Sequence, residues 1–391
     1  MKDVFIVSAL RTPFGSFGGA LADVTAPELA SQVISELIRR AALPGENVDE
    51  VIIGQVIQGG SAQAPARQAM RMAGLPDSTH AMTINKVCGS GLKAMMLAAD
   101  SIRLGDTQIA IAGGMENMSQ APYTLPKARL GQRLGNGELV DLLIYDALLD
   151  PYSKRHMGEI TEDWVTKQRL SREEQDTYAA RSYTLSQAAA KNGTFADELI
   201  SVIKKSRKGD TTITEDEEPS RGSIDQLSGL RPAFSKTGTI TAGNASTIND
   251  GAGLALLAEE EAIVKHGLKP IARMVTSATN SIHPDLFAEA PVDAIRKCCA
   301  KANLNLSDIG LFEINEAFSA VPLVTMKQLD LNPEIVNVNG GAVSIGHPVG
   351  ASGGRLVATL LREMKARKVK YGLTTLCIGG GEAVAAIFEL V

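Results

Sequence analysis

A cysteine, Cys88, stands where the sequence predicts the start of a helix. Gly89, Ser90 and Gly91 follow it, and apolar residues then recur with helical spacing as far as Ala99. Free amide N–H groups and the positive end of the helix dipole favour a thiolate there and can lower the pKa of a cysteine to roughly 3.5–7.5. The pattern predicts a nucleophilic thiolate, with a small, inert core cysteine as the alternative.

A histidine in a glycine-rich loop is a suitable partner for that thiol. His347 lies between Gly346 and Pro348, which present its imidazole rigidly at the end of a loop. An imidazole accepts a proton near neutral pH, so His347 is a candidate general base for Cys88. The alternative is a phosphate-cradling loop or a structural turn in which the histidine is incidental.

A second cysteine has similar surroundings near the C-terminus. An apolar run ends in Cys377, and Gly379 is the first of three consecutive glycines. One sulfur could attack a substrate while the other moves a proton, and the glycine N–H groups could form an oxyanion hole. An inert strand cysteine is the alternative.

Two polar residues, Asn315 and Glu316, follow another apolar run. Such residues are poor core filler unless they are hydrogen-bonded. They could position a water molecule or hold His347.

The elements that must position these groups follow a repeating plan. Strands and helices alternate, which predicts a parallel sheet with helices on both faces. Asp308 and His347 follow Asp49 and Cys88 by the same 259 positions (308 − 49 and 347 − 88). Two similar α/β halves, packed sheet beside sheet, would bring the ends of matching helices to one site. Strands are predicted at 4–9, 48–57, 107–112, 271–277 and 371–377, helices at 26–41, 65–73, 161–169, 172–192 and 351–365, and a turn at 113–119.

This plan divides the chain into four segments. Residues 1–118 and 246–267 form the N-terminal half, and residues 268–391 form the C-terminal half. Residues 119–245, with charged helices and a polar stretch, are an inserted loop domain over the two halves. Long insertions of this kind are often functional lids or binding surfaces.

Composition sets limits on the class of protein. The chain has 391 residues and a net charge of −5, which gives no reason to expect nucleic acid as a partner. Four cysteines are too few and too scattered for a disulfide framework or a zinc site, so a reducing, cytoplasmic location is expected. The apolar run near the N-terminus is too short to span a membrane.

The motifs together resemble those of the thiolase family, the acyl-CoA C-acyltransferases. Any one glycine-rich block is weak on its own, but the ordered set, which runs almost end to end, is specific. The family fold is a pair of similar α/β halves with an inserted loop domain. The matching blocks are Arg11-Thr-Pro-Phe-Gly, Ala64-Pro-Ala-Arg-Gln, Cys88-Gly-Ser-Gly, Gly113-Gly-Met-Glu-Asn-Met-Ser, Leu230-Arg-Pro-Ala-Phe, Thr241-Ala-Gly-Asn-Ala-Ser, Asn315-Glu-Ala-Phe, Asn339-Gly-Gly, Gly346-His-Pro-Val-Gly and Cys377-Ile-Gly-Gly-Gly.

The resemblance implies a reversible Claisen condensation of two acetyl-CoA molecules to acetoacetyl-CoA and CoA. His347 would take the proton from Cys88, which forms the acyl-enzyme, and Cys377 would deprotonate the second acetyl-CoA. One oxyanion hole would use the N–H groups of Cys88 and Gly379, and the other His347 and a water held by Asn315. No metal or cofactor is implied, since the thioesters are substrates and already activate the reacting atoms.

The resemblance also implies contacts with CoA, and the partners expected are acyl-CoA, CoA and further copies of the chain. Family members are commonly dimers or tetramers, and residues 120–143 resemble the loop used for tetramer contacts. The residues that match substrate-binding positions are Leu148, His156, Met157, Arg221, Phe234, Ala242, Gly243, Ser246, Ala317 and Phe318.

Two departures from the family pattern lie near the implied site. Phe287 stands in a stretch that is usually Met-Gly-x-Gly-Pro-like, and Glu382 replaces a more usual Met or Gln. Neither removes a catalytic group, but changes in the pocket bear on acyl-chain preference.

Other functions stay open beside the acetyl-CoA reaction. A degradative 3-ketoacyl-CoA thiolase of broad chain length is the nearest. A non-catalytic acyl-CoA or lipid carrier is expected to have lost Cys88, His347 or Cys377, and this sequence keeps all three. A ketoacyl-synthase-type enzyme would pair its cysteine with two histidines, or with histidine and asparagine. A dinucleotide-binding oxidoreductase would need a Gly-x-Gly-x-x-Gly motif after the first strand, and this sequence has none in that setting.

Overall fold

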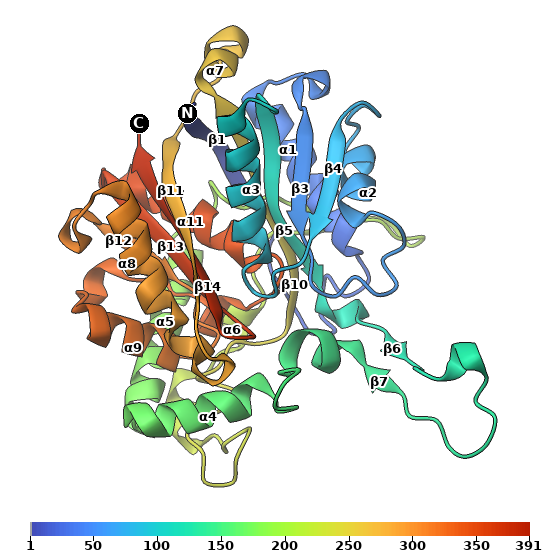
Figure 1. Ribbon diagram of the computed structural model, residues 1–391, viewed down its shortest axis with the longest axis vertical. Helices are drawn as coiled ribbons and strands as arrows, with labels where there is room; N and C mark the ends of the chain where they lie inside the picture. Colours follow the sequence, from blue (N-terminus) through green and yellow to red (C-terminus); the bar gives the residue numbers. More distant parts are fainter. Residues whose placement is uncertain (1) are drawn as a thin grey trace.

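Ten strands form one mixed sheet through the centre of the molecule, in a computed structural model that describes residues 2–391 (Figure 1). The order across the sheet is β12-β13-β14-β11-β1-β10-β5-β3-β4, and β2 pairs with β10 at its side. The strands are β1 (Val4–Arg11), β2 (Gly15–Ser16), β3 (Glu50–Gly54), β4 (His80–Ile84), β5 (Ile109–Asn117), β10 (Asn249–Glu259), β11 (Ala272–Ser281), β12 (Leu311–Ile314), β13 (Tyr371–Ile378) and β14 (Glu382–Leu390).

The sheet consists of two halves built to the same plan. Outward from the centre, one half runs β1, β10, β5, β3 and the other runs β11, β14, β13, β12. In both halves the middle one of the first three strands runs antiparallel to its two neighbours, and the last pair is parallel. The halves join where β1 pairs with β11 at Phe5–Arg273 and Ile6–Ala272. This symmetry confirms the prediction of two similar α/β halves.

The prediction of a parallel sheet is wrong. β10 and β14 each run antiparallel to both neighbours. β14 returns directly from β13 through the short turn at residues 379–381, and a tight turn can only join antiparallel strands. Parallel pairs remain where a helix crosses between strands, as between β3 and β5.

Helices cover the sheet in three layers. α1 and α2 pack on one face of the N-terminal half, α3 and α11 lie between the two halves, and α8 and α9 cover the outer face of the C-terminal half. These helices are α1 (Ala26–Ala41), α2 (Pro65–Met72), α3 (Ser90–Leu104), α8 (Ala290–Ala302), α9 (Ala320–Leu329) and α11 (Ser352–Arg367), with a short α10 (Ala342–Ile345). Short 3-10 helices are found at 45–47, 118–120, 128–130, 224–229, 284–289, 306–308 and 333–335.

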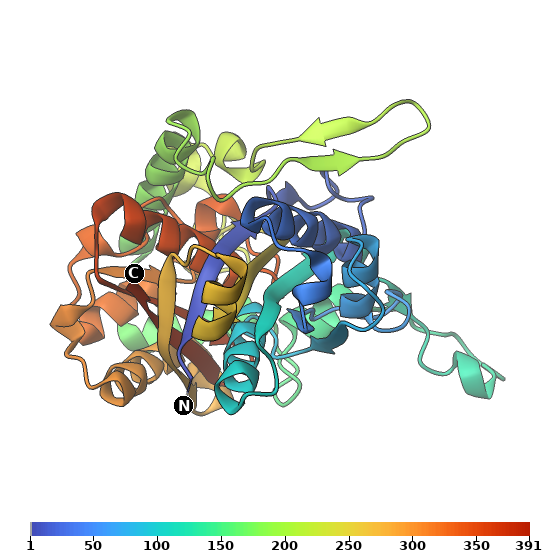
Figure 2. The same ribbon diagram turned by 90° about the horizontal axis from the view of Figure 1, so that it is seen from above.

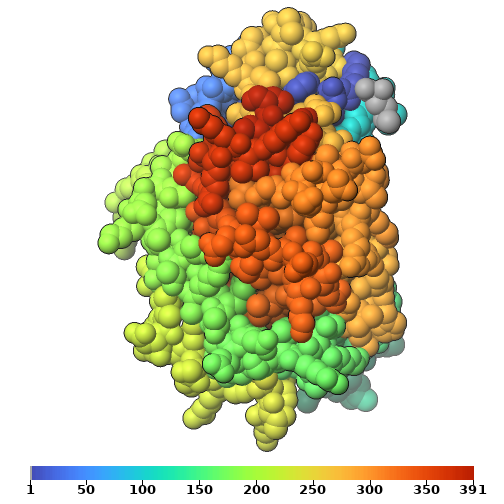
Figure 3. All heavy atoms as spheres, turned by 90° about the vertical axis from the view of Figure 1, so that its left-hand side faces the viewer, coloured from blue at the N-terminus to red at the C-terminus, as the bar shows by residue number. Residues whose placement is uncertain are grey.

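The segment between β5 and β10 adds no strand to the main sheet. It contains β6 (Tyr123–Thr124), β7 (Val140–Asp141), a π-helix (Leu143–Leu148), α4 (Met157–Gln168), α5 (Arg172–Lys191), β8 (Val202–Lys204), β9 (Thr211–Ile213) and α6 (Glu218–Arg221). The arm with β6 and β7 projects from the body (Figure 1), and the β8–β9 hairpin projects from another side (Figure 2). In the space-filling view, the green atoms of this segment lie against the orange and red atoms of the C-terminal half (Figure 3).

A buried ion-pair cluster ties the inserted segment to the first strand. Arg11 is fully buried, and its guanidinium donates to Glu198 at 2.6 Å and to Asp216 at 2.6 and 2.9 Å. Removing one member of such a buried group leaves an uncompensated charge, so the cluster holds the segment in place.

One strand is longer than predicted, because two glycines were interpreted as a turn. β5 continues through Gly113 and Gly114 to Asn117 and pairs with β10 along this whole stretch. A Cβ atom on Gly114 would lie 1.8 Å from the carbonyl oxygen of Gly350. Glycine is required here by a close approach between segments and not by a change in chain direction.

The two halves are connected by α7 (Glu260–His266), which follows β10 at the upper end of the molecule (Figure 1). Both chain termini lie near this end. Within the described residues, no helix combines the length and the apolar character needed to cross a lipid bilayer.

Candidate active site

The first turns of the two central helices, α3 and α11, touch through glycines. A Cβ atom on Gly353 would lie 2.3 Å from the backbone nitrogen of Leu92, and one on Gly91 would lie 2.8 Å from the carbonyl oxygen of Gly350. Backbones approach this closely only where side chains are absent. The contact brings Cys88, just before α3, and His347, just before α11, to the same region from different halves.

Cys88 is presented by a strained loop. Val87 has a φ of 45°, which is unusual for a β-branched residue and costs about 1–3 kcal/mol. The side chain of Asn85 accepts the N–H of Val87 at 2.9 Å, and the hydroxyl of Ser90 donates to the carbonyl oxygen of Val87 at 2.6 Å. These bonds hold the conformation that places the half-buried Cys88 ahead of α3.

His347 is fixed by contacts from both halves. Its backbone N–H donates to the side-chain oxygen of Asn249 on β10 at 2.8 Å. Its ring nitrogens lie 2.5 Å from the hydroxyl of Ser352 (Nδ1) and 3.4 Å from the amide nitrogen of Asn315 (Nε2). Burial, followed by the positive charge of Arg355, lowers the pKa of His347 to about 3. The ring is therefore neutral at physiological pH and able to accept a proton.

Cys377 lies at the end of β13, where the chain turns into β14. Gly380 and Gly381 have φ values of 88° and 87°, which the tight turn requires. Cys377 is buried, and burial, followed by the nearby Cys88, raises the pKa of its thiol above the usual range. The backbone N–H of Gly379 forms a hydrogen bond that lowers the pKa of Cys88.

These groups meet at one cavity of about 220 Å³. Cys88, His347, Cys377 and Gly379 all line it, and Asn315 lies fully buried beside His347. The structure thus brings the five candidate catalytic residues together. The predicted substrate-binding residues that also line the cavity are Leu148, His156, Met157, Phe234, Ser246, Ala317 and Phe318.

An aromatic group forms part of the cavity wall. The rings of His156 and Phe234 stack with centroids 4.9 Å apart, and Phe318 meets Phe234 edge-on at 6.2 Å. Nδ1 of His156 accepts the N–H of Gly158, which caps α4 and fixes the imidazole. A Cβ atom on Gly158 would lie 2.5 Å from the Phe234 ring, so glycine makes room for the stack.

Three residues predicted to bind CoA lie outside the cavity wall. Arg221 is exposed at the end of α6, and Ala242 is exposed in the loop before β10. Gly243 is buried beneath Leu227 and Leu230. Their assignment to CoA stays a prediction.

The expectation that Cys88 is a pre-formed thiolate is wrong. Burial raises the pKa of the Cys88 thiol to about 11, although hydrogen bonds from the N–H groups of Gly379 and of Cys88 itself act in the opposite direction. The negative charge of Glu116 adds to the increase. In the free protein, a neutral thiol and a neutral imidazole therefore line the same cavity.

Glu116 itself holds together loops from both halves. Its carboxylate accepts the backbone N–H groups of Val56, Ile57 and Gly350 at 2.9–3.1 Å. It is fully buried, and burial raises its pKa to about 7.

Sequence reasoning missed several residues of the cavity wall, most of them apolar. Met118, Ala245 and Val349 belong to matched motif blocks, but no pattern marked their side chains as lining the cavity. The others follow or precede identified residues without a signal of their own, because their position is set by distant contacts. The missed lining residues are Met118, Ala147, Ala245, Thr247, Ile248 and Val349.

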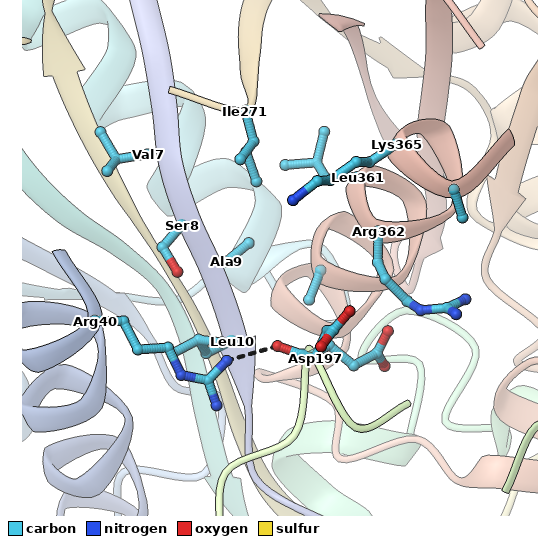
Figure 4. Close-up of a pocket in the computed structure, with 13 residues that line it drawn as sticks. Val7, Ser8, Ala9, Leu10, Arg40, Asp197, Ile271, Leu361, Arg362 and Lys365 are labelled. Carbon is cyan, nitrogen blue, oxygen red and sulfur yellow. Dashed lines mark hydrogen bonds between the residues drawn. The ribbon is translucent and has the colours of Figure 1, made fainter. Parts of the chain in front are cut away.

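A larger cavity of about 510 Å³ lies elsewhere, between β1, α1 and α11 (Figure 4). It contains Arg40, Arg362, Lys365 and Asp197, and Arg40 donates to the carbonyl oxygen of Asp197 at 2.7 Å. Its lining includes neither a cysteine nor a histidine. The candidate catalytic residues therefore gather at the smaller cavity and not at this one.

Comparison with known proteins gives consistent matches over the whole chain. The family model described as "Thiolase, N-terminal domain" matches residues 4–261, and "Thiolase, C-terminal domain" matches residues 268–390. "Acetyl-CoA acetyltransferase" of Cupriavidus necator is 48% identical over 391 residues, covering 100% of both chains. "Probable acetyl-CoA acyltransferase" of Staphylococcus aureus is 45% identical and covers 99% of each.

A solved structure matches equally completely. The Bacillus anthracis acetyl-CoA acetyltransferase superimposes with a TM-score of 0.97 at 42% identity, covering 100% of this chain and 99% of that one.

Proposed function

Because the chain belongs to the thiolase family, we propose that it is an acetyl-CoA C-acetyltransferase. It condenses two molecules of acetyl-CoA to acetoacetyl-CoA and CoA, and it catalyses the reverse thiolysis. The observation that carries this proposal is the convergence of Cys88, His347 and Cys377 on one small cavity. Full-length relatives named for this activity support it.

In the first half-reaction, His347 takes the proton of Cys88 and the thiolate attacks the carbonyl carbon of acetyl-CoA. The thioester bond to CoA then breaks, and CoA leaves with the proton returned by His347. The N–H groups of Cys88 and Gly379 hold the negative charge on the carbonyl oxygen. Cys88 and Gly379 line the same cavity, which supports this arrangement, because both donors then lie near the reacting carbon.

In the second half-reaction, Cys377 passes its thiol proton to the neutral ring of His347, and the Cys377 thiolate then removes a C2 proton from another acetyl-CoA. The resulting carbanion attacks the acetyl group on Cys88, and the Cys88 thiolate leaves and takes the proton held by His347. The raised pKa of Cys377 makes its thiolate a strong base, which suits a weakly acidic carbon. The N–H of protonated His347 and a water molecule held by Asn315 donate hydrogen bonds to the enolate oxygen. Oδ1 of Asn315 is buried and receives no hydrogen bond from residues 2–391, so it can hold such a water.

The size of the cavity supports a short acyl group. Its volume of about 220 Å³ is bounded by Phe287, which is 3% exposed, and by Met157. No metal or cofactor is required, because the thioester activates both the carbonyl carbon and the C2 proton. We assign the enzyme to short-chain acyl-CoA metabolism, with a role in fatty acid metabolism as the wider context.

The enzyme acts as a homo-oligomer in this proposal, as a dimer or a tetramer. β4 is the free edge strand of the main sheet, and Met82 on it is 43% exposed. The arm at residues 121–142 exposes Leu130 and Leu134 at 88% and 97%. Apolar side chains this exposed are typical of protein interfaces. Light scattering of the purified protein measures the oligomeric state.

We also place the enzyme in the cytoplasm. All four cysteines are free thiols, and a reducing compartment maintains that state.

The decisive experiment is CoA-dependent thiolysis of acetoacetyl-CoA beside a long-chain 3-ketoacyl-CoA on one enzyme preparation. Strong preference for acetoacetyl-CoA supports the proposal. Comparable or faster cleavage of the long chain would instead indicate a degradative thiolase of broad chain length. The Cys88→Ala variant is the control for background cleavage, and activity on neither substrate would favour an acyl-CoA carrier.

A further inference from the structure

An ion pair joins the two halves directly beside the nucleophile. Nζ of Lys86 lies 2.5 Å from a carboxylate oxygen of Glu382. Lys86 stands two residues before Cys88, and Glu382 stands three residues after Gly379. The pair therefore connects the loop that carries the sulfur with the turn that carries the N–H donor.

The Glu382 end of this pair is rigid. Glu382 opens β14, where its backbone pairs with Ser281 of β11 on one side and Ile378 of β13 on the other. Its second carboxylate oxygen accepts the hydroxyl of Ser281 at 3.1 Å. A residue held between two strands offers a fixed anchor for the long lysine side chain.

The Lys86 end belongs to the strained loop around Val87. Local hydrogen bonds shape this loop, but its position against the C-terminal half depends on other contacts. Gly89 packs against Ile378, because a Cβ atom there would lie 2.3 Å from the end of that side chain. The contact between Gly89 and Ile378 limits how closely the Cys88 loop can approach the C-terminal half. The ion pair between Lys86 and Glu382 attracts the loop towards that half.

We propose that Lys86 and Glu382 are positioning residues that hold the Cys88 sulfur against the N–H of Gly379. The inference rests on the proposed function, because it concerns the nucleophile of that reaction. It assigns a role to Glu382, which stands where the family pattern usually has Met or Gln.

The pair acts through position and not through its charge on the sulfur. The groups that shift the pKa of Cys88 are its burial, the N–H groups of Gly379 and Cys88, and the carboxylate of Glu116; Lys86 is not among them. A lysine neutralised at 2.5 Å by a carboxylate has little field left to act on a neighbour.

The experiment compares four variants with the wild-type enzyme. Glu382→Gln and Lys86→Met each break the pair with little change in side-chain volume. The double variant Lys86→Glu with Glu382→Lys restores the pair with exchanged charges. Glu389→Gln is the matched control, because Glu389 lies at the far end of β14 and forms a partly exposed ion pair with Arg273.

Two readouts are taken, one of which does not depend on turnover. The first is the rate at which iodoacetamide alkylates Cys88 in the free enzyme at low and high ionic strength. The second is kcat and KM for thiolysis of acetoacetyl-CoA. Thermal unfolding of each variant shows that the fold is retained.

Each single variant should lower the alkylation rate and kcat by about fivefold, the effect of one partly exposed ion pair, with KM unchanged. High salt should lower the wild-type rates in the same direction. The exchanged double variant should recover most of the loss, and Glu389→Gln should match the wild type.

Single variants as fast as the wild type, or a double variant as slow as the singles, would overturn the proposal. An equal loss in Glu389→Gln would do so as well, because it would indicate a general effect on β14. If wild-type enzyme lacked thiolase activity, the alkylation rates would still test the positioning role, so the two failures are distinguishable.

Discussion

Nδ1 of His347 lies 2.5 Å from the hydroxyl oxygen of Ser352. That hydroxyl donates its own proton to the carbonyl oxygen of Pro348 at 3.0 Å, so its oxygen accepts the N–H of Nδ1. The ring proton is thereby placed on Nδ1, and Nε2 is left as the acceptor. In the proposed first half-reaction, this tautomer leaves Nε2 ready to accept the proton of Cys88 before a substrate binds.

Replacing Ser352 by Ala should lower kcat by about tenfold, the cost of roughly one hydrogen bond that fixes a catalytic ring. KM should change little, because Ser352 does not line the cavity. Steady-state thiolysis measures both constants. Thr359→Val is a control on the same helix, since it also removes a buried hydroxyl, one bonded to Glu198. An equal loss of kcat in the control would show that α11 is disturbed as a whole.

The Cys88→Ala variant should form no acyl-enzyme and should keep its fold. Intact-protein mass spectrometry after incubation with acetyl-CoA measures the acetyl group directly. Because the change removes one sulfur atom at a cavity wall, the thermal transition should shift by only a few degrees. Normal acetylation or turnover by this variant would show that another residue is the nucleophile.

Replacing Cys377 by Ala should spare acetylation and block condensation. The base that removes the C2 proton is lost, while Cys88 and His347 remain. The variant should still take up one acetyl group, yet it should no longer exchange the methyl protons of acetyl-CoA with deuterium from the solvent. NMR follows this exchange. Loss of acetylation as well would mean that the two cysteines have been assigned the wrong roles.

Alkylation of Cys88 in the free enzyme should accelerate steadily with pH. Burial raises the pKa of Cys88 to about 11, so the thiolate fraction grows about tenfold per unit between pH 7 and pH 10. Iodoacetamide rates measured over this range give the profile, with Cys88→Ala as the blank for the other thiols. An alkylation rate that stops rising above pH 8 would instead indicate a Cys88 thiolate with a lowered pKa, as its position at the start of a helix suggested.

Shortening Phe287 to Ala should shift the preference towards longer 3-ketoacyl-CoA substrates. The side chain closes the cavity and is 3% exposed. The change also costs about 3–5 kcal/mol of stability, as for other buried Phe→Ala changes. The ratio of kcat/KM for two chain lengths, measured on one preparation, is insensitive to the active fraction. Phe195→Ala, equally buried in a separate cluster, controls for destabilisation.

Features set by neighbouring residues were predictable from the sequence. The predicted helix at 26–41 coincides with α1, because Thr25 and Glu28 form a capping box at its start. The helix after Cys88 begins at Ser90, where the glycine-rich turn places it. The two similar halves followed from the spacing of matched motifs along the chain.

Features set by distant contacts were not predictable. Gly114 suggested a turn, although its role is to approach Gly350, which comes from the other half. The direction of β10 depends on partners that the inserted segment separates in sequence. The pKa of Cys88 was predicted too low, because its burial is created by residues such as Cys377 and Val349, which local sequence around Cys88 does not show.

The connection between the halves has a consequence for chain continuity. β10 starts at Asn249, which holds His347, and ends at Glu259, where α7 begins, so about 33 Å of strand separate the linker from the reacting groups. The halves are held to each other by the sheet and by glycine contacts between the central helices, not by the linker. The candidate site therefore forms because the surfaces of the two halves pack together. A circularly permuted chain, cut at α7 and with its original termini joined, should form the same site.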